Sequence, residues 1–352
     1  MLKPEERFEA LDGLRGFAAL YVVVFHRLCF YPTSSQFSNR LLGYGYGSVQ
    51  LFFCLSGFLL AHTLKDAPRS AKSQLWDFWQ NRFWRIFPLW SIIILLHQFL
   101  FGMAGDVLLA NLTFIFGFFS YDSRWLPIVS AWSLFVEVLF YLLYPLLVLK
   151  LKKISHWTMF FILALCIRLA WQRFASSFGV PTSEYFISRH PLYNGSLFAA
   201  GICLRLFYDR TDLKSWLLEP SGGRTSLALA SLAVFLFFLP AWRASFPPEV
   251  GCVAVIAVAL KRGTFINVIS KGRAIRWIGV RCYAVYIGQM TLMKLMGPYK
   301  LLFSQWTGFH ELALELAWLP IFISVLLLFS AMSWRLVEFP CIRWGRSLSS
   351  SH

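Results

Sequence analysis

Charged residues are scarce in this chain, and acidic residues are the scarcest. Of its 352 residues only 14% are Asp, Glu, Lys or Arg, whereas an average soluble domain carries about 25%. The chain has 17 acidic and 33 basic residues, and 58% of all residues are hydrophobic. This combination excludes an ordinary soluble domain and is typical of an integral membrane protein.

Other features that are missing narrow the class further. The seven cysteines lie mostly inside apolar segments and lack the paired spacing of a zinc site or a disulfide framework, so we expect buried thiols and no metal. We find no linker, low-complexity tract, internal repeat or removable signal peptide. The sequence therefore predicts one transmembrane domain over residues 1–352, with a motif-bearing core at about 7–345 and no appended soluble domain.

Long apolar runs predict the membrane spans. Runs near 20 residues, the length needed to cross a bilayer as a helix, predict an all-α bundle of ten spans, at about 12–31, 46–64, 83–102, 131–149, 156–175, 190–208, 225–241, 247–261, 277–297 and 312–336. A shorter apolar segment at 107–119 is re-entrant or interfacial in this count, and it is an eleventh span in the alternative count.

The distribution of Lys and Arg decides between these counts. With ten spans, the basic loops 64–85, 150–156, 205–224 and 261–281 fall on the same side as both termini. The positive-inside rule then places that side in the cytoplasm. An eleventh span would move loop 150–156 to the other side, so ten spans are favoured and eleven stay open. The basic residues behind the net charge of +16 lie mostly in these loops. We therefore expect no nucleic-acid partner.

Two polar side chains stand out in the first span. Arg15 and His26 are eleven residues apart, which returns them to one helix face about 16 Å apart along the axis. Charged or titratable groups in lipid are costly and often functional. The alternative is an arginine anchored at the headgroups and a buried histidine with an ordinary structural partner.

A second polar group lies in the span that begins near Ala131. Ser133, Glu137 and Tyr141 recur every fourth residue and form one stripe, and a carboxylate in such a run needs a partner or a proton. His26 lies roughly 21 Å from the cytoplasmic end of its span and Glu137 roughly 18 Å from that of its own. The two could therefore meet, and a carboxylate beside an imidazole favours a general base.

Two further motifs lie near the cytoplasmic side or within a span. Arg82 and Arg85 share a helix face, and their planar guanidinium groups suit phosphate oxygens; ordinary interfacial anchoring is the alternative. Ser56 and Gly57 allow close approach of another helix or of an acyl chain, with packing alone as the simpler explanation.

These motifs, in this order, resemble the acyltransferase-3 family of integral-membrane O-acyltransferases. The resemblance rests on Leu11-Asp12-Gly13-Leu14-Arg15-Gly16 with His26, Phe52-Phe53-x-x-Ser56-Gly57-Phe58, Arg82-x-x-Arg85-Ile86-x-Pro88, Trp132-Ser133-Leu134-x-x-Glu137 with Phe140-Tyr141, and Glu338-x-Pro340. It covers nearly the whole chain. The family includes enzymes that modify O-antigen and nodulation oligosaccharides.

The resemblance implies a function and a site. It implies a multi-pass protein of the bacterial inner membrane that transfers an acyl group, commonly acetyl, from cytoplasmic acyl-CoA to a sugar hydroxyl in a glycan or glycolipid. His26 and Glu137 correspond to catalytic residues, and Arg15, Arg82 and Arg85 to donor-binding residues. We expect supporting roles for Asp12, Ser56, Trp132, Ser133 and Tyr141, and acyl-CoA as co-substrate without a tightly bound cofactor.

Two departures from the family and one alternative function stay open. Family members often carry Ser-Tyr followed by a histidine in a late span, whereas this chain has Cys282-Tyr283 followed by Gln289. The fused extracytoplasmic hydrolase-like domain of some relatives is not expected. The alternative is a transporter or permease for a lipid or glycan, with Arg168, Lys294 and Glu315 along its path; these three could equally be paired structural residues.

Overall fold

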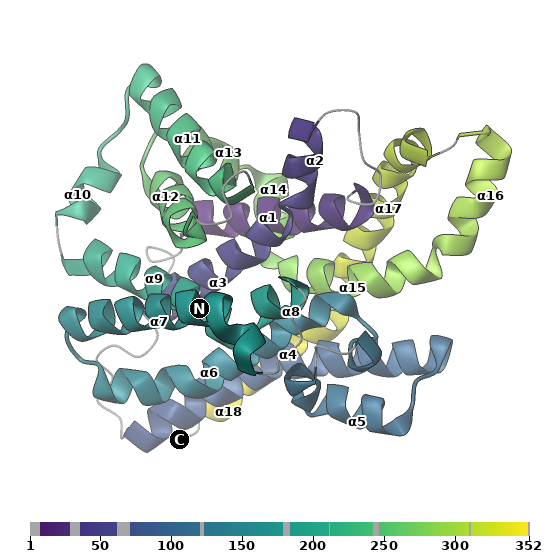
Figure 1. Ribbon diagram of the computed structural model, residues 1–352, viewed down its shortest axis with the longest axis horizontal. Coiled ribbons are helices and arrows are strands. Elements are labelled where there is room, and N and C mark those ends of the chain that lie inside the picture. The colour runs from purple at the N-terminus through teal and green to yellow at the C-terminus, as the bar shows by residue number, and fades with distance from the viewer. Residues whose placement is uncertain are drawn as a thin grey trace. The chain divides into compact units, whose positions relative to one another are not determined.

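The computed structural model describes residues 8–28, 36–61, 71–119, 123–178, 184–210, 212–241, 246–309 and 311–350. Throughout these ranges the regular secondary structure is helical, and none of the described residues lies in a strand (Figure 1). The all-α prediction is therefore confirmed. Cys29 and the beginning of loop 64–85 lie outside the described residues.

Each of the ten predicted spans contains a helix. These helices are α1 (Glu9–Leu28), α3 (Tyr46–Leu60), α4 (Ala71–Phe101), α6 (Trp132–Lys150), α7 (Ile154–Phe174), α9 (Pro191–Arg210), α11 (Gly223–Phe238), α12 (Pro248–Leu260), α15 (Cys282–Leu295) and α17 (Glu311–Ser333). Within the described residues, 5 helical segments are long and apolar enough to cross a membrane: Leu75–Phe101, Val129–Lys150, Ile154–Phe174, Gly223–Ala241 and Leu312–Leu348. The chain is thus a multi-pass membrane protein, and the count of ten with cytoplasmic termini stays a prediction.

Shorter helices connect or extend these segments. They are α2 (Gln36–Gly43), α5 (Gly105–Leu112), α8 (Glu184–Arg189), α10 (Leu213–Leu218), α13 (Phe265–Ser270), α14 (Arg273–Val280), α16 (Gly297–Thr307) and α18 (Phe339–Ser350). The 3₁₀ turns are η2 (Ile115–Phe118), η3 (Ser123–Trp125), η4 (Val129–Ala131), η5 (Ala175–Phe178) and η6 (Leu239–Ala241), and η7 (Trp334–Glu338) is a π-helical turn.

The segment at 107–119 contains a short helix and a break. Helix α5 has 8 residues and so rises about 12 Å, far less than the roughly 30 Å of a hydrocarbon core. Phe114 then adopts a left-handed backbone with φ 60° and separates α5 from η2. The segment therefore forms no single crossing helix, which favours the ten-span count over eleven.

The helices differ from the predicted spans at two places. Helix α4 begins at Ala71, before the predicted span 83–102, so Arg82 and Arg85 lie on one helix as predicted and part of the predicted loop 64–85 is helical. Hydropathy marks only the part of a helix inside the hydrocarbon, whereas the helix itself continues into polar surroundings. The predicted span 277–297 is two helices, α14 and α15, which meet at Arg281. The amphipathic α14 packs one face on α1, so its sequence does not continue the apolar span.

The chain divides into two compact units. The first comprises Met1–Leu59, Leu197–Tyr286 and Tyr299–Ser324, and the second comprises Leu60–Ser196, Ile287–Pro298 and Val325–His352. The predicted site residues are divided between them: Asp12, Arg15, His26 and Ser56 belong to the first, and Arg82, Arg85, Trp132, Ser133, Glu137 and Tyr141 to the second. That one functional domain uses both units stays a prediction.

Glycines set the packing of α1 in the first unit. A Cβ atom on Gly13 would lie 1.7 Å from the carbonyl oxygen of Ser270, and one on Gly279 would lie 1.7 Å from that of Asp12. The backbones of α1, α13 and α14 are therefore in direct contact (Figure 1). Small residues permit this close approach between helices in a membrane, and the contact fixes the rotation of α1 within its unit.

Aromatic side chains fix α6 against α4 and against the Leu60 backbone in the second unit. The indole Nε1 of Trp79 donates a hydrogen bond to the Tyr141 carbonyl at 3.1 Å. The Tyr144 hydroxyl donates to the Leu60 carbonyl at 2.8 Å. Because Tyr and Trp each combine a large apolar ring with one polar group, they can pack and hydrogen-bond together. The face of α6 that carries Glu137 is thereby held in place.

Candidate active site

A carboxylate and a phenol meet on α6. The Tyr141 hydroxyl donates a hydrogen bond to a carboxylate oxygen of Glu137, one helical turn earlier. Tyr141 is buried and Glu137 is half-buried. The two residues share the predicted polar stripe, because residues i and i+4 lie on one helix face; the hydrogen bond between them was not predicted. Glu137 thus has a partner inside its own helix.

A guanidinium group lies beside this pair. The Arg82 Cζ atom is 5.3 Å from the centre of the Tyr141 ring and 5.4 Å from that of Phe78. A cation over an aromatic face at this distance is attracted by the ring quadrupole. Arg85 lies one helical turn after Arg82 on the same helix, α4. We refer to Glu137, Tyr141, Arg82 and Arg85 as the Glu137 cluster.

The serine and the tryptophan before Glu137 have different surroundings. The Ser133 hydroxyl donates to the Ser130 carbonyl at 3.2 Å, so its proton is engaged by the backbone. Trp132 is 9% exposed, and the Arg189 Cζ atom lies 5.9 Å from its ring centre. Both residues lie at the start of α6, about one turn from the cluster.

In the first unit, α1 carries the other predicted residues. Arg15 is half-buried, and its buried Nε has no hydrogen-bond partner within the part of the chain that the structure describes. His26 is half-buried in the last turn of α1. Because His26 and Glu137 belong to different units, their predicted contact stays a prediction.

Ser56 and Gly57 lie where α3 packs on α9. A Cβ atom on Gly57 would lie 2.1 Å from the Phe198 carbonyl oxygen, and one on Gly201 would lie 1.9 Å from that of Cys54. The glycines therefore serve close helix packing, the simpler of the two explanations that the sequence allows. Ser56 is buried beside this contact.

One charged cluster was not predicted as part of the site. Glu315 on α17 is 2% exposed, and its Oε2 accepts a hydrogen bond from Arg27 Nη2 at 2.6 Å. Lys300 on α16 forms an ion pair with the other carboxylate oxygen. Since Arg27 directly follows His26, this triad holds the end of α1 that carries the histidine. A separation of 288 residues between Arg27 and Glu315 left no sequence signal for the pair.

The remaining charges considered for a transport path also have partners within their units. The Arg168 guanidinium donates to the Tyr193 hydroxyl at 3.3 Å and lies 4.6 Å from its ring centre. The Lys294 ammonium is 4.0 Å from the ring centre of Phe101. Paired structural roles explain these residues.

Comparison with known proteins assigns the family. The model of the acyltransferase-3 family, described as an acyltransferase domain, matches residues 8–335. The chain belongs to this family. The match extends over both units and includes all of the motif residues from Asp12 to Tyr141.

The relatives are bacterial proteins. The chain is 24% identical over 323 residues to a Bacillus subtilis protein that carries the name peptidoglycan O-acetyltransferase YrhL, a match that covers 82% of this chain and 49% of that protein. It is also 24% identical over 326 residues to the peptidoglycan O-acetyltransferase OatA of Listeria monocytogenes, covering 82% of this chain and 50% of OatA. The chain spans about half the length of these curated relatives. No solved structure gives a significant match.

Proposed function

We propose that this protein is a membrane O-acyltransferase that moves an acetyl group from cytoplasmic acetyl-CoA to a sugar hydroxyl. The family match over residues 8–335 supports the reaction class. The observation that carries the proposal is the Glu137 cluster, in which the buried Tyr141 is hydrogen-bonded to the Glu137 carboxylate and lies against the Arg82 guanidinium. Charged groups packed within apolar helices are costly and often functional.

In the proposed reaction, His26 removes the proton from the acceptor hydroxyl. The hydroxyl oxygen attacks the thioester carbonyl, a new ester C–O bond forms, and the C–S bond breaks. The proton held by His26 then passes to the CoA thiolate. Glu137 orients His26 and stabilises its protonated form, as a carboxylate does for a general base. Tyr141 holds the Glu137 carboxylate in position.

In this proposal the arginines bind the acyl donor. CoA carries phosphate groups, and guanidinium forks bind phosphate oxygens through paired hydrogen bonds. Arg82 and Arg85 lie one helical turn apart on α4. The Nε–H of Arg15 is a hydrogen-bond donor that has no partner among the described residues. We assign the CoA phosphates to these three residues. Ser133 or Ser56 would donate to the developing oxyanion, and Ser133 would first leave the Ser130 carbonyl.

The acceptor in this proposal is a saccharide of the cell envelope. YrhL and OatA are named as peptidoglycan O-acetyltransferases, so peptidoglycan fragments are the first acceptors to test, followed by glycolipids. The bacterial inner membrane is the proposed location, because it offers cytoplasmic acetyl-CoA on one face and envelope glycans on the other.

The test uses purified full-length protein in vesicles with radiolabelled acetyl-CoA and soluble peptidoglycan fragments. His26→Ala should lower the rate of acetyl transfer on the order of 10²–10⁴-fold, because a general base contributes about that much. His156→Ala, a histidine at the start of α7, is the matched control and should keep the wild-type rate. Full activity of His26→Ala would overturn the proposal. Glycan flux across the vesicle without acetyl-CoA would favour a transporter.

A further inference from the structure

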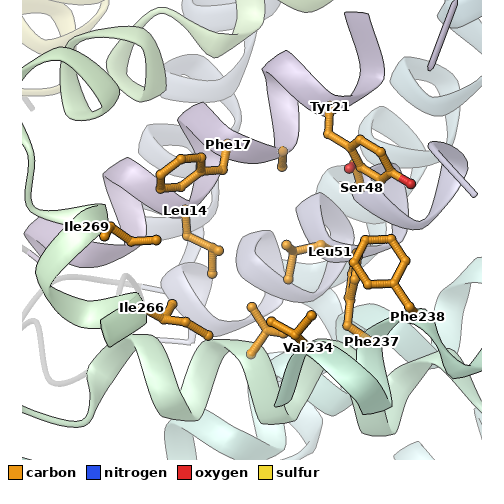
Figure 2. Close-up of a pocket in the computed structure, with 12 residues that line it drawn as sticks. Leu14, Phe17, Tyr21, Ser48, Leu51, Val234, Phe237, Phe238, Ile266 and Ile269 are labelled. Atoms are coloured by element: carbon orange, nitrogen blue, oxygen red, sulfur yellow. The ribbon is translucent and has the colours of Figure 1, made fainter. Parts of the chain in front are cut away.

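An apolar cavity lies on a different face of α1 from the candidate site residues. Its volume is about 270 Å³. It is lined by residues of α1, α3, α11, α12 and α13, all within the first unit: Leu14, Phe17, Ala18, Tyr21, Ser48, Leu51, Val234, Phe237, Phe238, Val255, Ile266 and Ile269 (Figure 2). The lining is hydrocarbon apart from two hydroxyl groups, so it offers no site for a charged or sugar ligand.

The cavity is separate from the face of α1 that carries Arg15 and His26. Leu14, Phe17 and Tyr21 follow one another at helical spacing and line one side of the cavity. At about 100° per residue their face points roughly a third of a turn away from that of Arg15 and His26. The cavity therefore does not open onto the predicted catalytic face, and a ligand there has another role.

The cavity lies beside α1. Figure 2 shows Ile266 and Ile269 of α13 on one side of it and Tyr21, Ser48 and Phe238 on the other. The Tyr21 hydroxyl is occupied, because it donates to the Leu41 carbonyl. A space lined almost entirely by hydrocarbon suits an apolar chain better than a polar ligand.

The mouth of the cavity opens on a surface suited to lipid. Of the lining residues, Phe17, Val234 and Ile269 are 38%, 45% and 36% exposed. The surrounding surface of α11 and α13 is also apolar, with Leu232, Phe235, Phe265 and Val268 exposed. Helix α11 lies within one of the segments able to cross a membrane. In a bilayer such a surface contacts acyl chains, because exposed apolar side chains of this number are unfavourable in water.

The rim at the α13 end is positively charged. Lys271 directly follows α13, Arg273 begins α14, and both are exposed. Residues 250–310 contain no acidic side chain, and Glu9 of α1 is paired with Arg276 of α14. Basic residues beside an apolar surface attract the headgroups of anionic lipids. The charge at this end and the hydrocarbon lining together select an amphiphile with an anionic head and a long apolar tail.

We propose that this cavity binds one acyl chain of an anionic phospholipid of the surrounding bilayer, with the headgroup phosphate at Lys271 and Arg273. The lipid would fill the space between α1 and α11 and so support the helix that carries His26. This binding site is independent of the proposed transfer reaction.

The test uses the full-length protein in phosphatidylcholine vesicles that contain a small amount of phosphatidylglycerol with a photoreactive diazirine in one acyl chain. After irradiation, mass spectrometry identifies the labelled residues. We expect labelled phosphatidylglycerol to place several-fold more label on the cavity-lining residues than phosphatidylcholine that carries the same diazirine chain. Val234→Trp should fill the mouth and remove this label. Leu232→Trp, a change at an exposed position of the same helix, should keep it.

The headgroup assignment has its own variant. Lys271→Gln with Arg273→Gln should lower the preference for phosphatidylglycerol roughly fivefold for each residue, the factor expected from about 1 kcal/mol per basic side chain. Lys152→Gln with Lys153→Gln removes two exposed charges of the second unit and should leave the preference for phosphatidylglycerol unchanged. Equal labelling by both lipids, or label unaffected by Val234→Trp, would overturn the proposal. Competition by long-chain acyl-CoA but not by unlabelled phosphatidylglycerol would also overturn it, by assigning the cavity to an acyl donor.

Discussion

Glu315→Ala should strongly destabilise the first unit. Glu315 is 2% exposed and pairs with both Arg27 and Lys300, whose side chains are 9% and 16% exposed. Removing the carboxylate leaves two poorly solvated cations close together. Breaking a buried ion pair in this way costs about 3–5 kcal/mol. For a unit of this size, each kcal/mol lowers Tm by about 2–4 °C, so we expect a decrease of roughly 10 °C.

Thermal unfolding of the purified protein in detergent, followed by intrinsic fluorescence, measures this effect. Glu219→Ala, at an exposed position after α10, is the matched control and should melt like the wild type. Exchanging Arg27, Lys300 and Glu315 together for methionine should recover much of the loss, because a buried ionic cluster can often be replaced by apolar side chains at little cost. An unchanged Tm for Glu315→Ala would refute the structural role of the triad.

A further prediction concerns helix packing. Gly279→Ala would place a Cβ atom 1.7 Å from the Asp12 carbonyl oxygen, whereas Gly222→Ala meets open space. We expect a loss of stability of about 1–3 kcal/mol only for Gly279→Ala, measured as a decrease in Tm. An equal Tm for the two variants would contradict the direct contact between the backbones of α1 and α14.

Local periodicity predicted the helices and part of the site. Apolar runs located the helices because hydrophobic side chains must cover a length of membrane. The four-residue spacing of Glu137 and Tyr141 predicted that they share one helix face, since this depends on one helix alone, but the hydrogen bond between them was not predicted. Arg82 was predicted as a cation near the site, but its place over Tyr141 depends on how α4 packs against α6.

Contacts between distant segments could not be predicted in the same way. The Arg27–Glu315 pair joins residues 288 positions apart, and no local pattern marks it. The break between α14 and α15 follows from the packing of Gly279 on the backbone of α1, so apolar content alone extended the span too far. The role of Gly57 was ambiguous for the same reason, because its neighbour Phe198 comes from a later helix.

A double-mutant cycle tests whether His26 and Glu137 act as one catalytic pair. The rate of acetyl transfer is measured for His26→Ala, Glu137→Gln and the double variant, each in vesicles and with matched protein amounts. Residues that act as a unit give strongly non-additive losses. We expect the double variant to be no slower than His26→Ala alone. Losses that multiply in the double variant would show that the two residues act independently, and the proposed pair would then be wrong.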